Sequence, residues 1–301
     1  MSTQGVARQP LDGTAIGLMV VLCAAWGLQQ VVIKVTAPLM GAVLQAGVRS
    51  AVAGLLVFGF AAWRGTPLWR RDGTLNAGLL AGLLFGAEFF CIFVGLGHTT
   101  ASRMAVFLYT APIFTALGLH AVVPGERLRP GQWLGVALAF AGMALAFADG
   151  IAAPSAQGST LLGDALGILA GALWAATTVV VRASPLAGAP ASKTLLYQLA
   201  VSAVMLLGMA LAGGQTAAVQ IDGVVLASLF YQSVLIAFAS YLAWFWLLQR
   251  YLASRLSVFS FLTPLFGVAF GVVLMHDAVG PRFAVAAVLV LAGIVLVNRR
   301  A

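Results

Sequence analysis

Long apolar stretches run through almost the whole chain, and they constrain its fold more than any other feature of the sequence. Each is close to the ~20 residues that a helix needs to cross the hydrocarbon core of a bilayer. Charged residues make up only 8% of the 301 residues, against about 25% in a water-soluble domain. The sequence therefore predicts an all-α integral membrane protein. The ten predicted transmembrane helices cover residues 14–34, 41–63, 74–97, 101–120, 131–149, 161–182, 193–212, 223–249, 253–275 and 282–298.

The basic residues between these stretches indicate how the chain crosses the membrane. Cytoplasmic segments of membrane proteins are enriched in Lys and Arg. If the N-terminus lies inside the cell, the outer segments hold only Lys34, Arg103 and Arg282 of the 16 basic residues. The net charge of +8 therefore fits a membrane topology, and we do not expect nucleic-acid binding. An even number of helices places both termini in the cytoplasm.

The second half of the sequence repeats the first. Residues 26–34 (WGLQQVVIK) align with residues 174–182 (WAATTVVVR), and residues 101–112 align with residues 253–264. The repeat predicts two units, residues 1–150 and 151–301, with five helices each. Because five is an odd number, the two copies must cross the membrane in opposite directions. Inverted repeats of this kind are typical of secondary transporters, which bind substrate near the membrane midplane between the copies.

This doubled pattern resembles the drug/metabolite transporter superfamily, specifically its ten-helix bacterial exporters built from two EamA-type repeats. The repeated segments, together with Arg49 and Glu126, carry the resemblance over nearly the whole chain. It is most similar to the exporters of aromatic amino acids. The resemblance implies an inner-membrane protein that exports amino acids with aromatic or apolar side chains by alternating access. In one departure, Tyr197 and Gln198 stand where the first repeat has Arg49, so a role of Arg49 need have no twin.

Other functions stay open beside this one. A broad exporter of drugs or metabolites from the same superfamily is the main alternative, and a channel-like facilitator is another. The chain has no HExxH, CxxC or Walker A motif, so we expect no enzyme, no metal site and no cofactor. The expected partners are a small-molecule substrate, membrane lipid and, if transport is coupled, protons.

Two charged residues fall inside predicted helices, where an isolated charge costs several kcal/mol. Glu88 is a candidate for binding a proton or a substrate ammonium group. Arg49 is a candidate for binding a substrate carboxylate through its forked guanidinium group. The alternative is a structural role, in which Arg49 pairs with Glu88 or with backbone carbonyls.

Amide and aromatic side chains complete the predicted substrate site. Gln30 and Gln232 offer both donors and acceptors to a zwitterion without adding charge. Tyr109, Trp174 and Tyr241 offer rings that can stack on an aromatic side chain. The alternative for each residue is ordinary contact between helices or with lipid.

Glycine and proline positions suggest where helices pack closely or bend. Small residues at four-residue spacing let helix backbones approach, and proline removes one backbone donor from a helix. Symmetric bends of this kind could act as hinges or as static kinks. The candidate packing and hinge residues are Gly82, Gly86, Gly167, Gly271, Pro112 and Pro264.

Overall fold

The computed structural model is helical, as the sequence predicts. It describes residues 9–96, 98, 99, 101–148, 160–216, 219–275 and 282–299. Among these residues no strand forms, and an isolated β-bridge joins Gln9 to Tyr251. The helices are α1 (Gly13–Thr36), α2 (Ala42–Trp63), α3 (Thr74–Leu96), α4 (Ala101–Leu108), α5 (Ala111–Val122), α6 (Pro130–Ala146), α8 (Thr160–Ala183), η1 (Pro185–Gly188), α9 (Ala191–Ala212), α10 (Gly223–Phe230), η2 (Tyr231–Ser240), α11 (Tyr241–Arg250), α12 (Ala253–Phe259), α13 (Leu262–Met275) and α14 (Arg282–Asn298).

The lengths of these helices fit a membrane protein. Within the described residues, eight helices or continuous helix groups are long and apolar enough to cross a bilayer. The apolar helices α6 and α14 have 17 residues each, which is the lower limit for a spanning helix. Each of the ten ranges predicted from the sequence contains helix. The prediction of a helical membrane protein is therefore confirmed.

Two of the predicted helices are broken, and this corrects the sequence-based interpretation. Residues 101–120 form α4 and α5 with a break at Tyr109 and Thr110, and residues 253–275 form α12 and α13 with a break at Ser260 and Phe261. Pro112 and Pro264 therefore lie at the start of a second helical segment and not inside an unbroken helix. The reason is that the proline ring excludes a hydrogen bond to the preceding turn but fits the first turn of a new helix.

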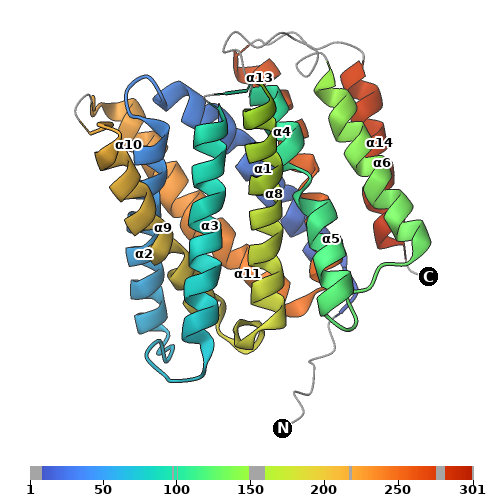
Figure 1. The fold of residues 1–301 in the computed structure, drawn as a ribbon, viewed down its shortest axis with the longest axis horizontal. Coiled ribbons are helices and arrows are strands. Elements are labelled where there is room, and N and C mark those ends of the chain that lie inside the picture. The colour runs from blue at the N-terminus through green and yellow to red at the C-terminus, as the bar shows by residue number, and fades with distance from the viewer. Residues whose placement is uncertain are drawn as a thin grey trace.

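The helices pack in three groups across the bundle (Figure 1). The pair α2 and α9 forms one flank and the pair α6 and α14 forms the other. Between the flanks, α3 and α5 pack against α8, and α1 packs against α13. The sequence alignment pairs α1 with α8, α3 with the span from α10 to α11, and α5 with α13. The contact of α3 with α8 therefore corresponds to a contact of η2 with α1, and the contact of α5 with α8 corresponds to a contact of α13 with α1. Both of these partner contacts are present in the structure.

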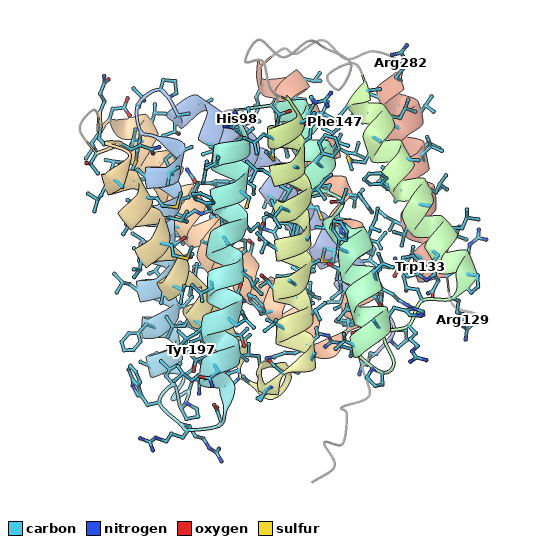
Figure 2. The ribbon with its side chains drawn as sticks, viewed as in Figure 1. His98, Arg129, Trp133, Phe147, Tyr197 and Arg282 are labelled. Carbon is cyan, nitrogen blue, oxygen red and sulfur yellow. The ribbon has the colours of Figure 1, made fainter. Side chains whose placement is uncertain are left out.

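Basic residues gather at one end of the bundle, which we call the basic end. The connections α2–α3, α5–α6, α8–α9 and α11–α12 meet there, on the side where Figure 2 shows Tyr197 and Arg129. His98 and Arg282 lie at the opposite end (Figure 2). Lys34, predicted for that opposite end, has a side chain outside the described part of the structure. The basic end holds Arg64, Arg70, Arg71, Arg127, Arg129, Arg182, Lys193, Arg250 and Arg255.

Matching helix ends reinforce the internal repeat. Both α2 and α9 end in a glycine of positive φ, Gly65 at 63° and Gly214 at 67°. In each case the next residue donates its backbone N–H to the carbonyl five residues earlier, Thr66 to Ala61 at 2.8 Å and Gln215 to Ala210 at 2.9 Å. Glycine suits this turn because it adopts positive φ without strain. The two copies thus stop their second helix by the same device.

Candidate functional site

Two buried ionisable residues, one basic and one acidic, lie in the middle of α2 and α3. Arg49 of α2 is 2% exposed and Glu88 of α3 is 7% exposed. The two groups interact electrostatically, but no hydrogen bond or ion pair between them is found. The Arg49 guanidinium carbon lies instead 4.7 Å from the centre of the Phe89 ring, a cation–π contact. The structural pair considered from the sequence is therefore not a closed salt bridge.

Several buried polar atoms of α2, α3, α9 and η2 have no hydrogen-bond partner among the described residues. They are Nε and Nη2 of Arg49, Oε2 of Glu88, Nε2 of Gln198, Oε1 of Gln232 and Oγ of Ser233. All five side chains are buried, on α2, α3, α9 and η2. A buried donor or acceptor left unpaired costs about 1–3 kcal/mol, and more when it is charged. Ordered water or a bound ligand satisfies buried groups of this kind in known proteins.

A chain of amides joins α2 to η2 beside the charged pair. Gln232 donates from Nε2 to Oε1 of Gln45 at 2.9 Å and to the Ser228 hydroxyl at 2.9 Å. Gln45 in turn donates to the Met40 carbonyl at 2.6 Å. Gln232 therefore lies near the predicted site while its own Oε1 stays unpaired. The side chain of Gln30, also predicted for the site, lies outside the described part of the structure.

Aromatic rings form two groups next to Glu88. In one, the Tyr241 ring lies 6.1 Å from Phe85 and 6.5 Å from Trp26, in edge-to-face geometry. In the other, Tyr109 packs edge-on against Trp174 at 5.8 Å. Both tyrosines lie within electrostatic range of Glu88. The structure therefore brings Tyr109, Trp174 and Tyr241 together with the buried carboxylate.

The helix segment η2 is a π-helix of ten residues inside a longer span. Its two ends are fastened to α1, because the Tyr231 hydroxyl donates to the Ala25 carbonyl at 2.9 Å and Trp26 donates from Nε1 to the Ser240 hydroxyl at 2.9 Å. π-Helical turns are rare and occur often at functional sites. Here the segment carries Gln232 and Ser233, both with unpaired oxygens.

The predicted glycines lie at close contacts between the two halves. A Cβ atom added to Gly82 would lie 2.7 Å from Cβ of Val201, and one added to Gly86 would lie 2.6 Å from Sδ of Met205. At Gly167 it would lie 2.9 Å from Cβ of Phe107. These glycines therefore let α3 approach α9 and let α8 approach α4. Gly271 is buried in α13.

The sequence-based site omitted Trp26, Phe85 and the π-helix. Trp26 stands in the repeated segment, so the internal alignment was the available signal for it. Phe85 has no such signal because helix 3 carries four phenylalanines. The π-helix has none either, since its composition is that of any apolar helix.

A second feature is a cleft at the basic end, with a volume of about 520 Å³. None of the site residues predicted from the sequence lines it. Its walls come from α1, α2, α9 and α11 and from the segment after α2. The lining residues are Leu18, Phe60, Arg64, Thr66, Ala191, Ser192, Leu242, Ala243 and Trp246.

The described residues contain no group of three or more His, Cys, Asp or Glu side chains arranged to hold a metal ion. Cys23 and Cys91 are both buried and free. Charge, amide groups and aromatic rings are the chemistry that the central site offers.

Known proteins match both halves of the chain. The model of the EamA-like transporter family matches residues 13–148 and again residues 161–299. A probable amino-acid metabolite efflux pump of Salmonella typhimurium is 29% identical over 293 residues, which is 94% of this chain and 93% of the relative. A protein of the same description from Escherichia coli is 28% identical over 290 residues, with the same coverage. A solved structure, described only as a crystal structure of a protein, superimposes with a TM-score of 0.78 at 18% identity and 94% coverage of each chain, which supports the fold alone.

Proposed function

Because this chain belongs to the EamA-like transporter family and is an efflux transporter of that type, we propose that it exports amino acids with aromatic or apolar side chains. One observation carries the proposal. Arg49 and Glu88 offer a basic and an acidic group buried in the middle of spanning helices, lie within electrostatic reach of each other and have unpaired polar atoms. A zwitterion supplies a partner for both charges at once.

The site suits the two ends of an amino acid. The carboxylate of the substrate pairs with the Arg49 guanidinium group, whose planar fork suits two carboxylate oxygens. The ammonium group pairs with Glu88. Substrate binding then offsets the cost of keeping two charges in a medium that disfavours them. Gln232 and Ser233 of η2 supply neutral donors and acceptors.

The rings beside Glu88 accept the substrate side chain. Phe85, Trp26 and Tyr241 form one wall, and Tyr109 with Trp174 forms another. Edge-to-face and offset contacts with an aromatic ligand add about 0.5–1.5 kcal/mol beyond the area buried. An amino-acid substrate, though not the aromatic preference, is supported by the relatives described as probable amino-acid metabolite efflux pumps.

We infer that export proceeds by alternating access between two inverted halves of five spans each. The contact between α6 and α14 supports this symmetry. A Cβ at Gly142 would lie 2.8 Å from the Ala286 carbonyl, and a Cβ at Gly293 would lie 2.5 Å from the Gly135 carbonyl. Under the internal alignment, Gly142 corresponds to Gly293 and Ala286 corresponds to Gly135. The two halves then rock against each other, with substrate bound along their seam.

The basic end faces the cytoplasm in this proposal. Lys and Arg are retained on the cytoplasmic side of inner-membrane proteins, and the four connections at the basic end carry such residues. The exposed Trp63 and Trp69 lie at the same end, as expected for side chains at the membrane interface. Both termini are therefore cytoplasmic.

Transport by purified protein in liposomes tests the function. We expect labelled phenylalanine to be transported, threonine to be transported more slowly, and a cationic dye to be excluded. Movement of the dye alone would show that the protein is a drug exporter of the same superfamily. Flux that rises linearly with phenylalanine concentration, without saturation, would indicate a channel-like facilitator.

A further inference from the structure

We propose that the cleft at the basic end is the site where substrate enters from the cytoplasm, and that the ring pair Phe60–Phe238 separates it from the central charged site. This inference rests on the proposed function, because it assigns the same substrate a first binding site. The ligand class is an amphipathic molecule with a carboxylate and an apolar or aromatic side chain. The cleft, its polar lining residues and the ring pair carry the inference.

The cleft lies on the seam between the two halves. Leu18 and Phe60 belong to the first half, and Ser192, Leu242 and Trp246 belong to the second. A volume of about 520 Å³ is within the range of small-molecule sites. A site between two halves that rock against each other changes shape during transport, which a binding groove on one outer face would not do.

The lining of the cleft fits an amphipathic anion or zwitterion. Arg64 and Thr66 follow directly on the end of α2 at the basic end, and the hydroxyl group of the buried Ser192 adds a second polar wall. The other lining residues are apolar or aromatic. The concentration of basic residues at this end raises the local concentration of carboxylate-bearing solutes. The chemistry thus repeats that of the central site, with a cation beside rings.

Phe60 lines the cleft, and its ring packs edge-on against Phe238 with centroids 6.0 Å apart. Phe238 belongs to the π-helix η2, which also carries Gln232 and Ser233 of the central site. Farther along the same contact of α2 with η2 lies the hydrogen bond between Gln45 and Gln232. Separation of the two rings therefore opens the cleft toward the central site.

Labelling of a single introduced cysteine tests the entry site. Ser192→Cys places a thiol in the cleft, and Cys23 and Cys91 are buried, so the unsubstituted protein measures the background. In inverted membrane vesicles, which expose the cytoplasmic face, a small charged thiol reagent should label Ser192→Cys. Labelling follows the unoccupied fraction, so phenylalanine at about ten times its Kd should slow labelling roughly tenfold.

The matched control is Arg71→Cys in the exposed α2–α3 connection at the same end, where phenylalanine should not change labelling. Transport of phenylalanine by the wild-type protein without protection of Ser192→Cys would overturn the entry site and leave the proposed function intact. Protection by lipid of defined headgroup in detergent, with no protection by phenylalanine, would show that the cleft holds lipid. The labelling experiment and the transport experiment can therefore fail independently of each other.

A second experiment tests the ring pair independently of transport. Ser233→Cys places a thiol in the central site, where the serine is buried. The reagent should label Ser233→Cys slowly from the cytoplasmic side and much faster when Phe60→Ala is added. Phe60→Leu keeps most of the bulk and should leave labelling slow. Equal labelling in all three proteins would overturn the role of the Phe60–Phe238 pair.

Discussion

Glu126 and Arg182 form an ion pair that joins the two halves of the chain at the basic end, with both side chains 1% exposed. The Glu126 carboxylate also accepts from the backbone N–H groups of Ala253 and Ser254, each at 3.0 Å, and from the Ser254 hydroxyl at 2.8 Å. Arg182 donates to the Leu248 carbonyl at 2.7 Å. One carboxylate therefore holds the start of α12 and the end of α8 to the α5–α6 connection.

Removal of either partner of this pair should destabilise the protein strongly. Glu126→Met leaves a buried guanidinium group, and Arg182→Met leaves a buried carboxylate, each at a cost of about 3–5 kcal/mol. The double substitution leaves no unpaired charge and should recover part of the loss. Recovery is incomplete because the N–H groups of Ala253 and Ser254 lose their acceptor. Thermal unfolding in detergent measures all three variants, and single variants as stable as the wild type would contradict the prediction.

A second ion pair predicts how stability depends on pH. Asp72 accepts from the Thr74 hydroxyl at 2.6 Å and from Lys193 Nζ at 2.9 Å, and these two groups, Thr74 first, hold the pKa of Asp72 below its ordinary value of 3.8. A lowered pKa means that the contribution to stability is fully present above pH 3.8 and is lost as the pH falls toward the folded-state pKa.

The unfolding temperature of Asp72→Asn should therefore lie below that of the wild type at neutral pH, and the difference should shrink in acid. In a Thr74→Val background, Asp72→Asn should change the unfolding temperature less than it does in a Lys193→Met background. The reason is that Thr74 is the larger cause of the lowered pKa of Asp72. A gap that stays constant from neutral pH to below pH 3.8 would show that Asp72 makes no such contribution.

The sequence predicted the helices well because each is bounded by residues with a clear physical role. The range 41–63 differs from α2 (Ala42–Trp63) by one residue, since Gly65 provides the turn that ends the helix. The breaks in the fourth and ninth predicted helices could be placed near Pro112 and Pro264 but not located. The position at which an α-helix breaks near a proline depends on which neighbouring residues accommodate the freed carbonyl groups. That is a property of packing.

The site was predicted as a set of residue types, and its geometry could not be. Depth in an apolar stretch marked Arg49 and Glu88, but whether they close into a salt bridge depends on side-chain packing, including the Phe89 ring. The pair Glu126–Arg182 joins residues 56 positions apart. The charge count assigned both to the inner side of the membrane, yet it could not tell which cation meets which anion.

Close packing of α6 on α14 predicts a sharp effect of added methyl groups. A Cβ at Gly293 would lie 2.5 Å from the Gly135 carbonyl and 2.6 Å from the Ala139 nitrogen. Gly293→Ala and Gly135→Ala should each cost about 1–3 kcal/mol through overpacking. Gly208→Ala in α9 is the matched control, because no atom lies within 4 Å of its Cβ, and it should be neutral or stabilising. Equal unfolding temperatures in all three variants would contradict the close contact.

The two charges of the central site should recognise different ends of the substrate. Arg49→Met should weaken binding of phenylalanine by about 1.5–3 kcal/mol, or roughly 10- to 150-fold, through loss of a charged hydrogen bond. Binding of phenethylamine, which has no carboxylate, should change little. Arg49→Lys keeps the charge without the fork, and its affinity for phenylalanine should lie between those of the wild type and Arg49→Met. Competition against labelled phenylalanine measures each affinity, and equal losses for both ligands would remove Arg49 from carboxylate recognition.

Glu88 should couple export to protons as well as bind the ammonium group. It is a buried carboxylate with an unpaired oxygen beside the substrate site, so it can hold either a proton or an ammonium group but not both at once. Glu88→Gln cannot ionise, and phenylalanine transport in liposomes should then lose its response to an imposed pH gradient. Asp72→Asn removes an acidic group at the basic end, and this variant should keep the response to the pH gradient. A gradient that stimulates Glu88→Gln as strongly as the wild type would mean that the proton is carried elsewhere, whereas wild-type transport without any response would indicate facilitated diffusion.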